Sequence, residues 1–126
     1  KMNFVTATYT NAWAETTGYL NVKDPWNSMA KTYGQIILNN NLKHRLELMK
    51  KMIKTYSVDG MVMHSTRSCK PYSVGQFDLR KAITTDLDLP AVILDADIAD
   101  ERVWSEQQIH TRLEAFCETL EGSKHG

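Results

Sequence analysis

The stretch Met61–Lys70, which reads MVMHSTRSCK, constrains the fold of this chain more than any other part of the sequence. Mostly apolar residues follow an Asp59-Gly60 turn and run into a polar loop that contains Cys69, and Pro71 then opens a helix-like segment. A strand that passes through a short loop into a helix is the repeating unit of parallel α/β sheets, whose ligands bind beyond the carboxyl ends of the strands. The sequence therefore predicts that Cys69 lies at the sheet edge where a ligand would bind.

Strand and helix patterns alternate on both sides of this stretch. Ala91–Leu94 is an all-apolar run typical of a parallel strand covered on both faces, and the β-rich run Asn3–Tyr9 predicts a first strand. Four helices are predicted. The first begins at Asp24-Pro25 and ends near residue 39, the second covers residues 42–56, the third covers residues 75–87, and the last runs from Ser105 to Gly122. This order predicts one α/β domain over residues 1–126, a three-layer Rossmann-like domain with a small parallel sheet flanked by helices.

Apolar residues recur at helical spacing within each predicted helix and are the candidates for its buried face. These stripes are Trp26, Met29, Ala30, Tyr33 and Ile37 in the first helix, Leu42, Leu46, Met49, Met52 (or Ile53) and Tyr56 in the second, Phe77, Leu79, Ala82 and Ile83 in the third, and Ile109, Leu113, Phe116 (or Cys117) and Leu120 in the last.

Charge and cysteine usage exclude several classes of protein. The 126 residues carry 15 Lys and Arg against 15 Asp and Glu, so there is no basic footprint for nucleic acid, and no apolar run approaches the roughly 18 residues that a membrane span needs. Two cysteines in different contexts offer no disulfide framework, and no signal peptide follows Lys1, so we expect a cytoplasmic protein. Because a strand-like run begins almost at once, we expect a piece of a longer protein, with residues 122–126 as a frayed tail.

Cys69 is the leading candidate for chemistry. Arg67 and Lys70 lie within two residues of it, and nearby positive charge together with a following helix N-terminus favours a thiolate. A thiolate attacks electrophiles or ligates a soft metal. The alternative is a small buried core residue, which is a common role for free cysteine, although the polar neighbours of Cys69 argue against full burial.

Other polar residues have both a functional and a structural interpretation. Asp95, Asp97 and Asp100 follow the Ala91–Leu94 strand and could bind a metal or a ribose, but aspartate also favours loops and caps, which is the interpretation that we prefer. His64 could face the ligand or simply be hydrogen-bonded. Cys117 lies on or beside an apolar helix face and is interpreted as a core residue.

A resemblance to a known family goes further than these patterns. The run from Asp59 to Gln76, DGMVMHSTRSCKPYSVGQ, resembles the signature of the 2-hydroxyacyl-CoA dehydratase family, which also contains the ATP-driven benzoyl-CoA reductases. The later run Leu89–Asp97, followed by Arg102, by SEQ at residues 105–107 and by TRLEAF at residues 111–116, is similar to the ending of that family. The resemblance covers residues 41–121 well and the first forty weakly.

The resemblance implies a cofactor and a ligand. Family subunits bind a 4Fe-4S cluster through three cysteines, and the one in the RSCK-like loop corresponds to Cys69. The other two belong to an N-terminal domain outside this chain, which would then be the C-terminal cluster-binding domain of a longer subunit. Cys117 matches no ligand position, so no cluster is expected in the isolated chain. Arg67, Ser68 and Lys70 would tune the cluster or face substrate, and His64 and Gln76 are weaker candidates for the same cavity.

The resemblance also implies a reaction and partners. A lyase of this family eliminates water from (R)-2-hydroxyacyl-CoA through a ketyl radical, after an ATP-hydrolysing activator protein delivers one electron, and it works with a homologous second subunit. The alternative within the family is a subunit of an ATP-dependent benzoyl-CoA reductase. Two interpretations from other classes stay open, namely a cluster-free α/β module that binds a small molecule, and a thiol enzyme with Cys69 as nucleophile and His64 as base. The isolated chain is expected to be inactive.

Overall fold

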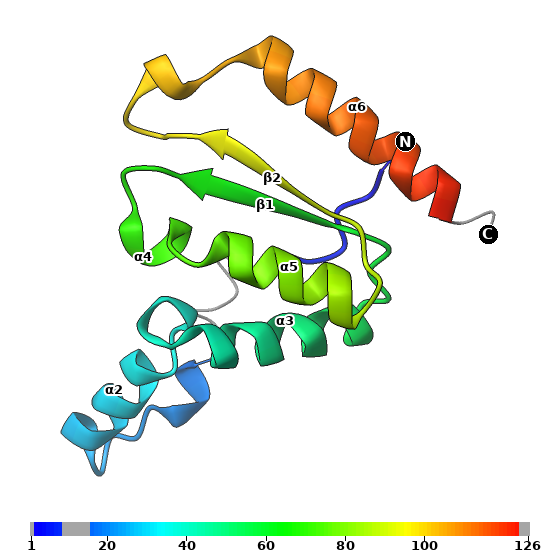
Figure 1. Cartoon of the computed structure of the whole chain (residues 1–126). Helices are drawn as coiled ribbons and strands as arrows, with labels where there is room; N and C mark the ends of the chain where they lie inside the picture. Colours follow the sequence, from blue (N-terminus) through cyan, green and yellow to red (C-terminus); the bar gives the residue numbers. More distant parts are fainter. Residues whose placement is uncertain (1, 9–15, 124–126) are drawn as a thin grey trace.

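A two-stranded parallel sheet lies at the centre of the computed structural model, which describes residues 2–8 and 16–123 (Figure 1). Strand β1 (Met61–Thr66) pairs with β2 (Ala91–Ala96) in a register that sets Met61 opposite Ala91 and Thr66 opposite Ala96. Both strands were predicted. Strand β1 continues three residues beyond its apolar run and β2 continues two, so the ladder carries polar side chains to the carboxyl edge of the sheet.

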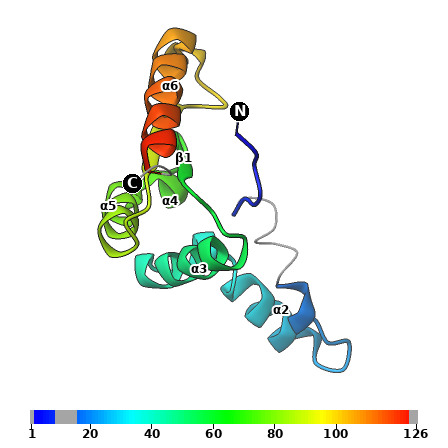
Figure 2. The same ribbon diagram turned by 90° about the vertical axis from the view of Figure 1, so that its right-hand side faces the viewer.

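Helices flank the sheet, and in the view of Figure 1 α6 lies above β2 whereas α5 and α3 lie below β1; Figure 2 shows the same elements from the side. The helices are α2 (Pro25–Gly34), α3 (Leu42–Thr55), α4 (Lys70–Ser73), α5 (Gln76–Asp86) and α6 (Glu106–Ser123), with 3-10 turns η1 (Thr17–Tyr19), η2 (Ile37–Asn39) and η3 (Glu101–Val103). The α/β class and the small parallel sheet flanked by helices are confirmed. Two strands do not by themselves establish a Rossmann-like topology. No helix in the described ranges is long and apolar enough to cross a membrane.

Three predicted boundaries differ from the structure. The strand predicted over Asn3–Tyr9 is wrong for residues 3–8, which form no ladder with β1. A strand depends on a hydrogen-bonded partner, and these residues have none in the sheet. Tyr9 lies outside the described residues. The first helix ends at Gly34, before η2 begins. Helix α6 continues through Gly122 to Ser123, and the rest of the expected tail lies outside the described residues.

The main core lies between the sheet and the α3–α5 layer. Met63, Leu79 and Ile93 form its buried centre, and Leu42, Leu46, Met49 and Met61 pack against it. Ile83 is fully buried, and Phe116 is buried on α6. The apolar stripes of α3, α5 and α6 are therefore confirmed in the main. Phe77 is an exception with 74% of its surface exposed, because two residues along a helix place it some 200° around from Leu79. Tyr56 is another, since α3 ends one residue before it and its side chain is exposed.

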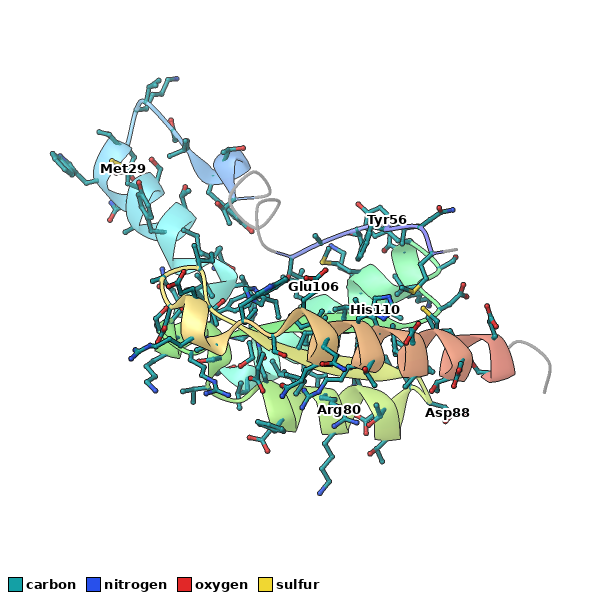
Figure 3. The ribbon with its side chains drawn as sticks, turned by 90° about the horizontal axis from the view of Figure 1, so that it is seen from above. Met29, Tyr56, Arg80, Asp88, Glu106 and His110 are labelled. Atoms are coloured by element: carbon teal, nitrogen blue, oxygen red, sulfur yellow. The ribbon has the colours of Figure 1, made fainter. Side chains whose placement is uncertain are left out.

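Within α2 the stripe predicted for the first helix does not face a core, although its last member, Ile37, is buried in η2. Trp26 is 81% exposed, and Met29 and Tyr33 are also exposed, whereas the small polar residues Ser28 and Thr32 form the buried side of α2. Figure 3 shows Met29 on α2, away from the sheet. Helical spacing identified an apolar face, but the described part of the chain supplies nothing that covers it.

Side chains bind three carbonyl groups that point outward from the strands. The N–H of Met61 donates to Pro90 O, so alternate β1 residues point toward β2 and the others point away. On the outer edge of β2, Arg80 Nε donates to Ala91 O (2.9 Å) and Arg112 Nη1 donates to Ile93 O (3.0 Å). On the outer edge of β1, His64 O accepts from Gln76 Nε2 (2.6 Å). Helices α5 and α6 are thereby fixed to the edges of the strands.

Arg45 is a buried cation on α3, with 8% of its surface exposed. Its guanidinium donates through Nε to Ile37 O (3.0 Å) and Asn40 O (3.1 Å), through Nη2 to Leu38 O (3.0 Å) and through Nη1 to Pro71 O (2.7 Å). These four carbonyls belong to the η2 region and to α4. One side chain therefore joins α3 to the segment before it and to the short helix that follows Cys69.

Replacing Arg45 with methionine should lower the free energy of unfolding by about 3 kcal/mol, because four carbonyl oxygens lose a charged donor and those that stay buried gain no replacement. Urea unfolding followed by circular dichroism measures this loss. Lys43→Met, an exposed site on the same helix, is the matched control and should stay within about 0.5 kcal/mol of wild type. Equal losses in the two variants would contradict the role given to the guanidinium.

Candidate functional site

The loop after β1 holds Cys69 at the carboxyl edge of the sheet, where the sequence predicted it. Cys69 precedes α4, its N–H donates to Thr66 O (3.0 Å), and its carbonyl accepts from Tyr72 N (3.1 Å), Ser73 N (3.0 Å) and Ser73 Oγ (2.9 Å). Its thiol is free and half-buried. The backbone of Cys69 is thus fully hydrogen-bonded while its sulfur is still accessible.

The loop after β2 is joined to the Cys69 loop through Asp97. Ser68 N donates to Asp97 Oδ2 (2.6 Å), and Ser68 Oγ donates to Asp97 Oδ1 (2.9 Å). The same Oδ1 accepts from Ala99 N (2.9 Å) within its own loop. The N–H groups of Ala99 and Ser68 hold the pKa of the Asp97 carboxyl below its ordinary value, because both hydrogen bonds favour the charged form.

The two cations that flank Cys69 are exposed. The Arg67 guanidinium lies 3.9 Å from Asp95 Oδ2, an ion pair in which both side chains are well exposed to solvent. Lys70 is exposed in the first turn of α4. Their expected influence on the thiol of Cys69 stays a prediction.

Gln76 and His64 meet at the edge of β1. Gly75, with a φ of 84°, turns the chain into α5, so Gln76 becomes the first residue of that helix and lies only 4% exposed. Its Nε2 donates to His64 O, while its buried Oε1 has no hydrogen-bond partner among the described residues. The half-buried His64 ring lies beside the Thr66 hydroxyl, 3.3 Å from Nδ1.

A cavity of about 560 Å³ lies behind this contact. Its walls come from residues 2–8, α3, β1 and α6, and His64, Gln76 and Cys117 line it. Cys69 does not line it. The Cys117 thiol is half-buried and lies 3.7 Å from Met2 Sδ, so the two cysteines belong to different surroundings. The loop that carries Cys69 is therefore separate from the cavity, whereas the contact between His64 and Gln76 lies beside the cavity.

The three aspartates beyond β2 act separately. Asp95 faces Arg67, Asp97 binds Ser68, and Asp100 caps η3 through Arg102 N (3.1 Å) while its carboxylate pairs with the Arg102 guanidinium (both contacts 2.8 Å). That guanidinium is the main cause of the lowered pKa of Asp100. In the described ranges no three His, Cys, Asp or Glu side chains come together as a metal site. The loop-and-cap interpretation is confirmed for Asp97 and Asp100.

Chemically, the arrangement offers one accessible sulfur on a loop that is tied down at both ends. It does not offer a base for a nucleophilic thiol, because the hydrogen-bonding neighbour of the His64 ring is Thr66, and no hydrogen bond joins that ring to Cys69 in the described part of the chain. A single thiolate can be one ligand of a metal centre but cannot hold that centre alone.

Two functional contacts were missed at the level of the sequence. Arg45 lies three residues after Leu42 and four before Met49, so the helical spacing already placed it on the buried face of α3. The Ser68–Asp97 contact joins residues 29 positions apart, and nothing in the sequence paired them.

Comparison with known proteins gives one family and several relatives. The model of the family described as "2-hydroxyglutaryl-CoA dehydratase, D-component" matches residues 1–120. A benzoyl-CoA reductase subunit of Thauera aromatica is 30% identical over 82% of this chain and 24% of its own length. The alpha subunit of lactoyl-CoA dehydratase from Anaerotignum propionicum is 35% identical over 76% of this chain and 23% of its own length. The (R)-phenyllactyl-CoA dehydratase alpha subunit of Clostridium sporogenes is 29% identical over 98% of this chain. The chain spans about a quarter of the length of these curated relatives.

The lowered pKa values of Asp97 and Asp100 predict a sensitivity to acid. A carboxyl whose pKa is lower in the folded chain than in the unfolded chain stabilises the fold above its ordinary value of 3.8, and this stabilisation is lost as the pH falls through the lower folded value. The free energy of unfolding should therefore fall as the pH drops from about 5 to below 3.8. Asp97→Asn and Asp100→Asn should each lose less stability over the same range.

Urea unfolding at a series of pH values, read by circular dichroism, measures both slopes. An unchanged slope in either variant would show that its carboxylate does not contribute to the acid sensitivity.

Proposed function

Because the chain belongs to the 2-hydroxyglutaryl-CoA dehydratase D-component family, whose model matches residues 1–120, we propose that it is the C-terminal cluster-binding domain of a longer acyl-CoA dehydratase subunit. The carrying observation is the position of Cys69 within this match, a free and half-buried thiol at the carboxyl edge of a parallel sheet. Relatives named as dehydratases of lactoyl-CoA and (R)-phenyllactyl-CoA support a 2-hydroxyacyl-CoA as the substrate class.

The chemistry of Cys69 fits one ligand of a 4Fe-4S cluster. Iron–sulfur clusters are held by cysteine thiolates, and Cys69 presents its sulfur from a loop whose backbone is fully hydrogen-bonded. Cys117 does not complete the ligand set, since its sulfur lies beside Met2 on the cavity side. The remaining ligands would come from outside this chain, so the isolated chain should hold no cluster and should be inactive.

In the whole enzyme, an ATP-hydrolysing activator would deliver one electron to the cluster. The cluster would then supply this electron to the substrate, which side chains cannot do. The acyl-CoA thioester, reduced by this electron to a ketyl radical anion, would expel the 2-hydroxyl group as hydroxide, which becomes water on taking up a proton. Loss of a proton from the neighbouring carbon would then give the enoyl-CoA with the electron returned. The part that falls to this chain is to hold one thiolate in place. Arg67, Ser68 and Lys70 would surround the cluster or the substrate, and the two cations among them would suit the anionic thioester radical and the phosphates of coenzyme A.

His64 and Gln76 would act from behind the loop. The Gln76 amide fixes the His64 carbonyl on β1, two residues before the strand ends, and so supports the start of the Cys69 loop. The unpartnered Gln76 Oε1 is the acceptor on this side that a substrate or a further protein group could use.

Partners follow from the same proposal. The relatives are named as subunits, so we infer a homologous second subunit as well as the activator, in a reducing cytoplasm. Neither nucleic acid nor a membrane surface is inferred as a partner, since the balanced charges of the chain give no excess of basic residues that would attract phosphate groups.

A second candidate is a subunit of an ATP-dependent benzoyl-CoA reductase. The observation that favours it is the relative named as a subunit of benzoyl-CoA reductase, which is 30% identical over 82% of this chain. Turnover by the whole enzyme separates the two activities, because a dehydratase forms an enoyl-CoA and a reductase consumes benzoyl-CoA. A cluster-free binding module and a thiol enzyme have less support, the latter because His64 and Cys69 share no hydrogen bond in the described residues.

Iron and sulfide counts on the full-length subunit, purified without oxygen together with its partner subunit, test the proposal. The wild type should hold about four iron atoms per subunit, and Cys69→Ala should lose most of them, because one of the cluster's thiolates is gone. Cys117→Ala is the matched control and should keep its iron. Full iron in Cys69→Ala would remove this residue from the ligand set, and no iron in the wild type would favour the binding module.

A further inference from the structure

We propose that Asp97 is a positioning residue for the Cys69 thiol, acting through Ser68 on one side of the loop while Arg45 holds the other side through Pro71. The inference rests on the proposed function and goes beyond it, because it assigns a role to two side chains that ligate nothing. It stands on hydrogen bonds that join three separate parts of the fold at one short loop.

The Asp97 carboxylate is more than the cap of its own turn. A cap alone would need only the bond from Ala99 N to Oδ1, which was the local role that the sequence indicated. Instead Oδ2 is devoted to Ser68 N at 2.6 Å, and Oδ1 also accepts from Ser68 Oγ at 2.9 Å. A carboxylate that accepts from both the backbone and the hydroxyl of one residue fixes the position and the rotation of that residue, and charge-assisted bonds of this kind are the strong ones.

Ser68 is the residue directly before Cys69, so its fixation is transmitted to the thiol. The N–H of Cys69 is held by Thr66 O, and its carbonyl is held by the first turn of α4. With Ser68 tied to Asp97, the chain on the N-terminal side of Cys69 is held by hydrogen bonds from two loops. The orientation of its Cα–Cβ bond is then set by the β2 loop as much as by its own loop.

Arg45 holds the chain on the C-terminal side of Cys69. Its Nη1 donates to Pro71 O at 2.7 Å, two residues after Cys69, and the rest of the guanidinium is anchored on the η2 carbonyls. Since α3 packs against α5 and the sheet core, α4 is held to the body of the domain rather than to its own loop alone. The thiol therefore sits between two anchors from different elements, one anionic and one cationic.

This arrangement suits a metal ligand more than a mobile nucleophile. Groups that orient a metal ligand typically change metal affinity by tenfold to a hundredfold when they are removed. A thiol held at a fixed angle would also fix the distance and hydrogen bonding of the cluster sulfurs, which set a reduction potential.

The test uses the full-length subunit with its partner subunit, purified without oxygen. In Asp97→Asn, a chelator should remove iron about tenfold faster than in the wild type, and the midpoint potential and electron paramagnetic resonance spectrum of the cluster should shift. Asp100→Asn is the matched control, an acidic residue of the same loop that binds Arg102 instead, and it should behave as wild type in all three measurements. The thermal midpoint of each variant is measured alongside.

A double-mutant cycle then asks whether the effect passes through Ser68. Ser68→Ala removes only the hydroxyl bond, should fold as the wild type does, and should raise the rate of iron loss less than Asp97→Asn. The rate increase in the double variant should be smaller than the combined effects of the two single changes, since the hydroxyl bond that Ser68→Ala removes is one of the contacts that the loss of charge in Asp97→Asn weakens. Arg45→Lys keeps the charge but not the guanidinium fork, and should shift the potential in a protein that still folds.

The outcomes separate the inference from the proposed function. Wild-type iron loss, potential and spectrum in both Asp97→Asn and Ser68→Ala, with iron still lost in Cys69→Ala, would overturn the inference and leave the function standing. Full iron in Cys69→Ala would overturn the function itself. Strictly additive effects of the Ser68 and Asp97 changes would also overturn the inference, because the two residues would then act independently.

Discussion

A buried guanidinium holds this small domain together. Arg45 gives up its hydration for four carbonyl oxygens and has no carboxylate among its hydrogen-bond partners in the described residues, so its charge is balanced by peptide dipoles. The cost of burying a cation is offset only by hydrogen bonds to its donors, and the bonds that Arg45 makes require η2 and α4 to lie where they do. The direction in which the chain enters α3 and the placement of the helix after Cys69 therefore depend on the same side chain.

The site follows from how parallel strands end. Because β1 and β2 finish at the same edge in register, the loops that leave them meet, and Ser68 and Asp97 join them at a residue adjacent to Cys69. The chain belongs to the 2-hydroxyglutaryl-CoA dehydratase D-component family and spans about a quarter of the length of its curated relatives. The structure shows what this chain can contribute to a site. It contributes one accessible sulfur on a fixed backbone, together with exposed cations beside it.

Local patterns predicted the parts of the fold that depend on local physics. An apolar run between turn signals was enough for β1 and β2, and helical spacing was enough for the buried faces of α3 and α6, including Leu46 and Phe116. The same spacing failed for Trp26, because a stripe defines a face but not what covers it. The N-terminal strand was wrong for residues 2–8, since pairing depends on a partner edge. Cys69 could be placed at a strand end from sequence, but the carboxylate that fixes its neighbour lies 29 residues away and carries no sequence signal.

The two arginines on the outer edge of β2 make the sheet one-sided. Because Ala91 O and Ile93 O are already bonded to Arg80 and Arg112, these two carbonyl groups are not available to a new strand or to another copy of the protein at that edge. On the opposite edge, the Val62 backbone faces the cavity along which residues 2–8 run. A further strand would therefore pair more readily with β1 than with β2, both during folding and in misassembly. The two guanidinium groups thus make the two edges of the sheet unequal.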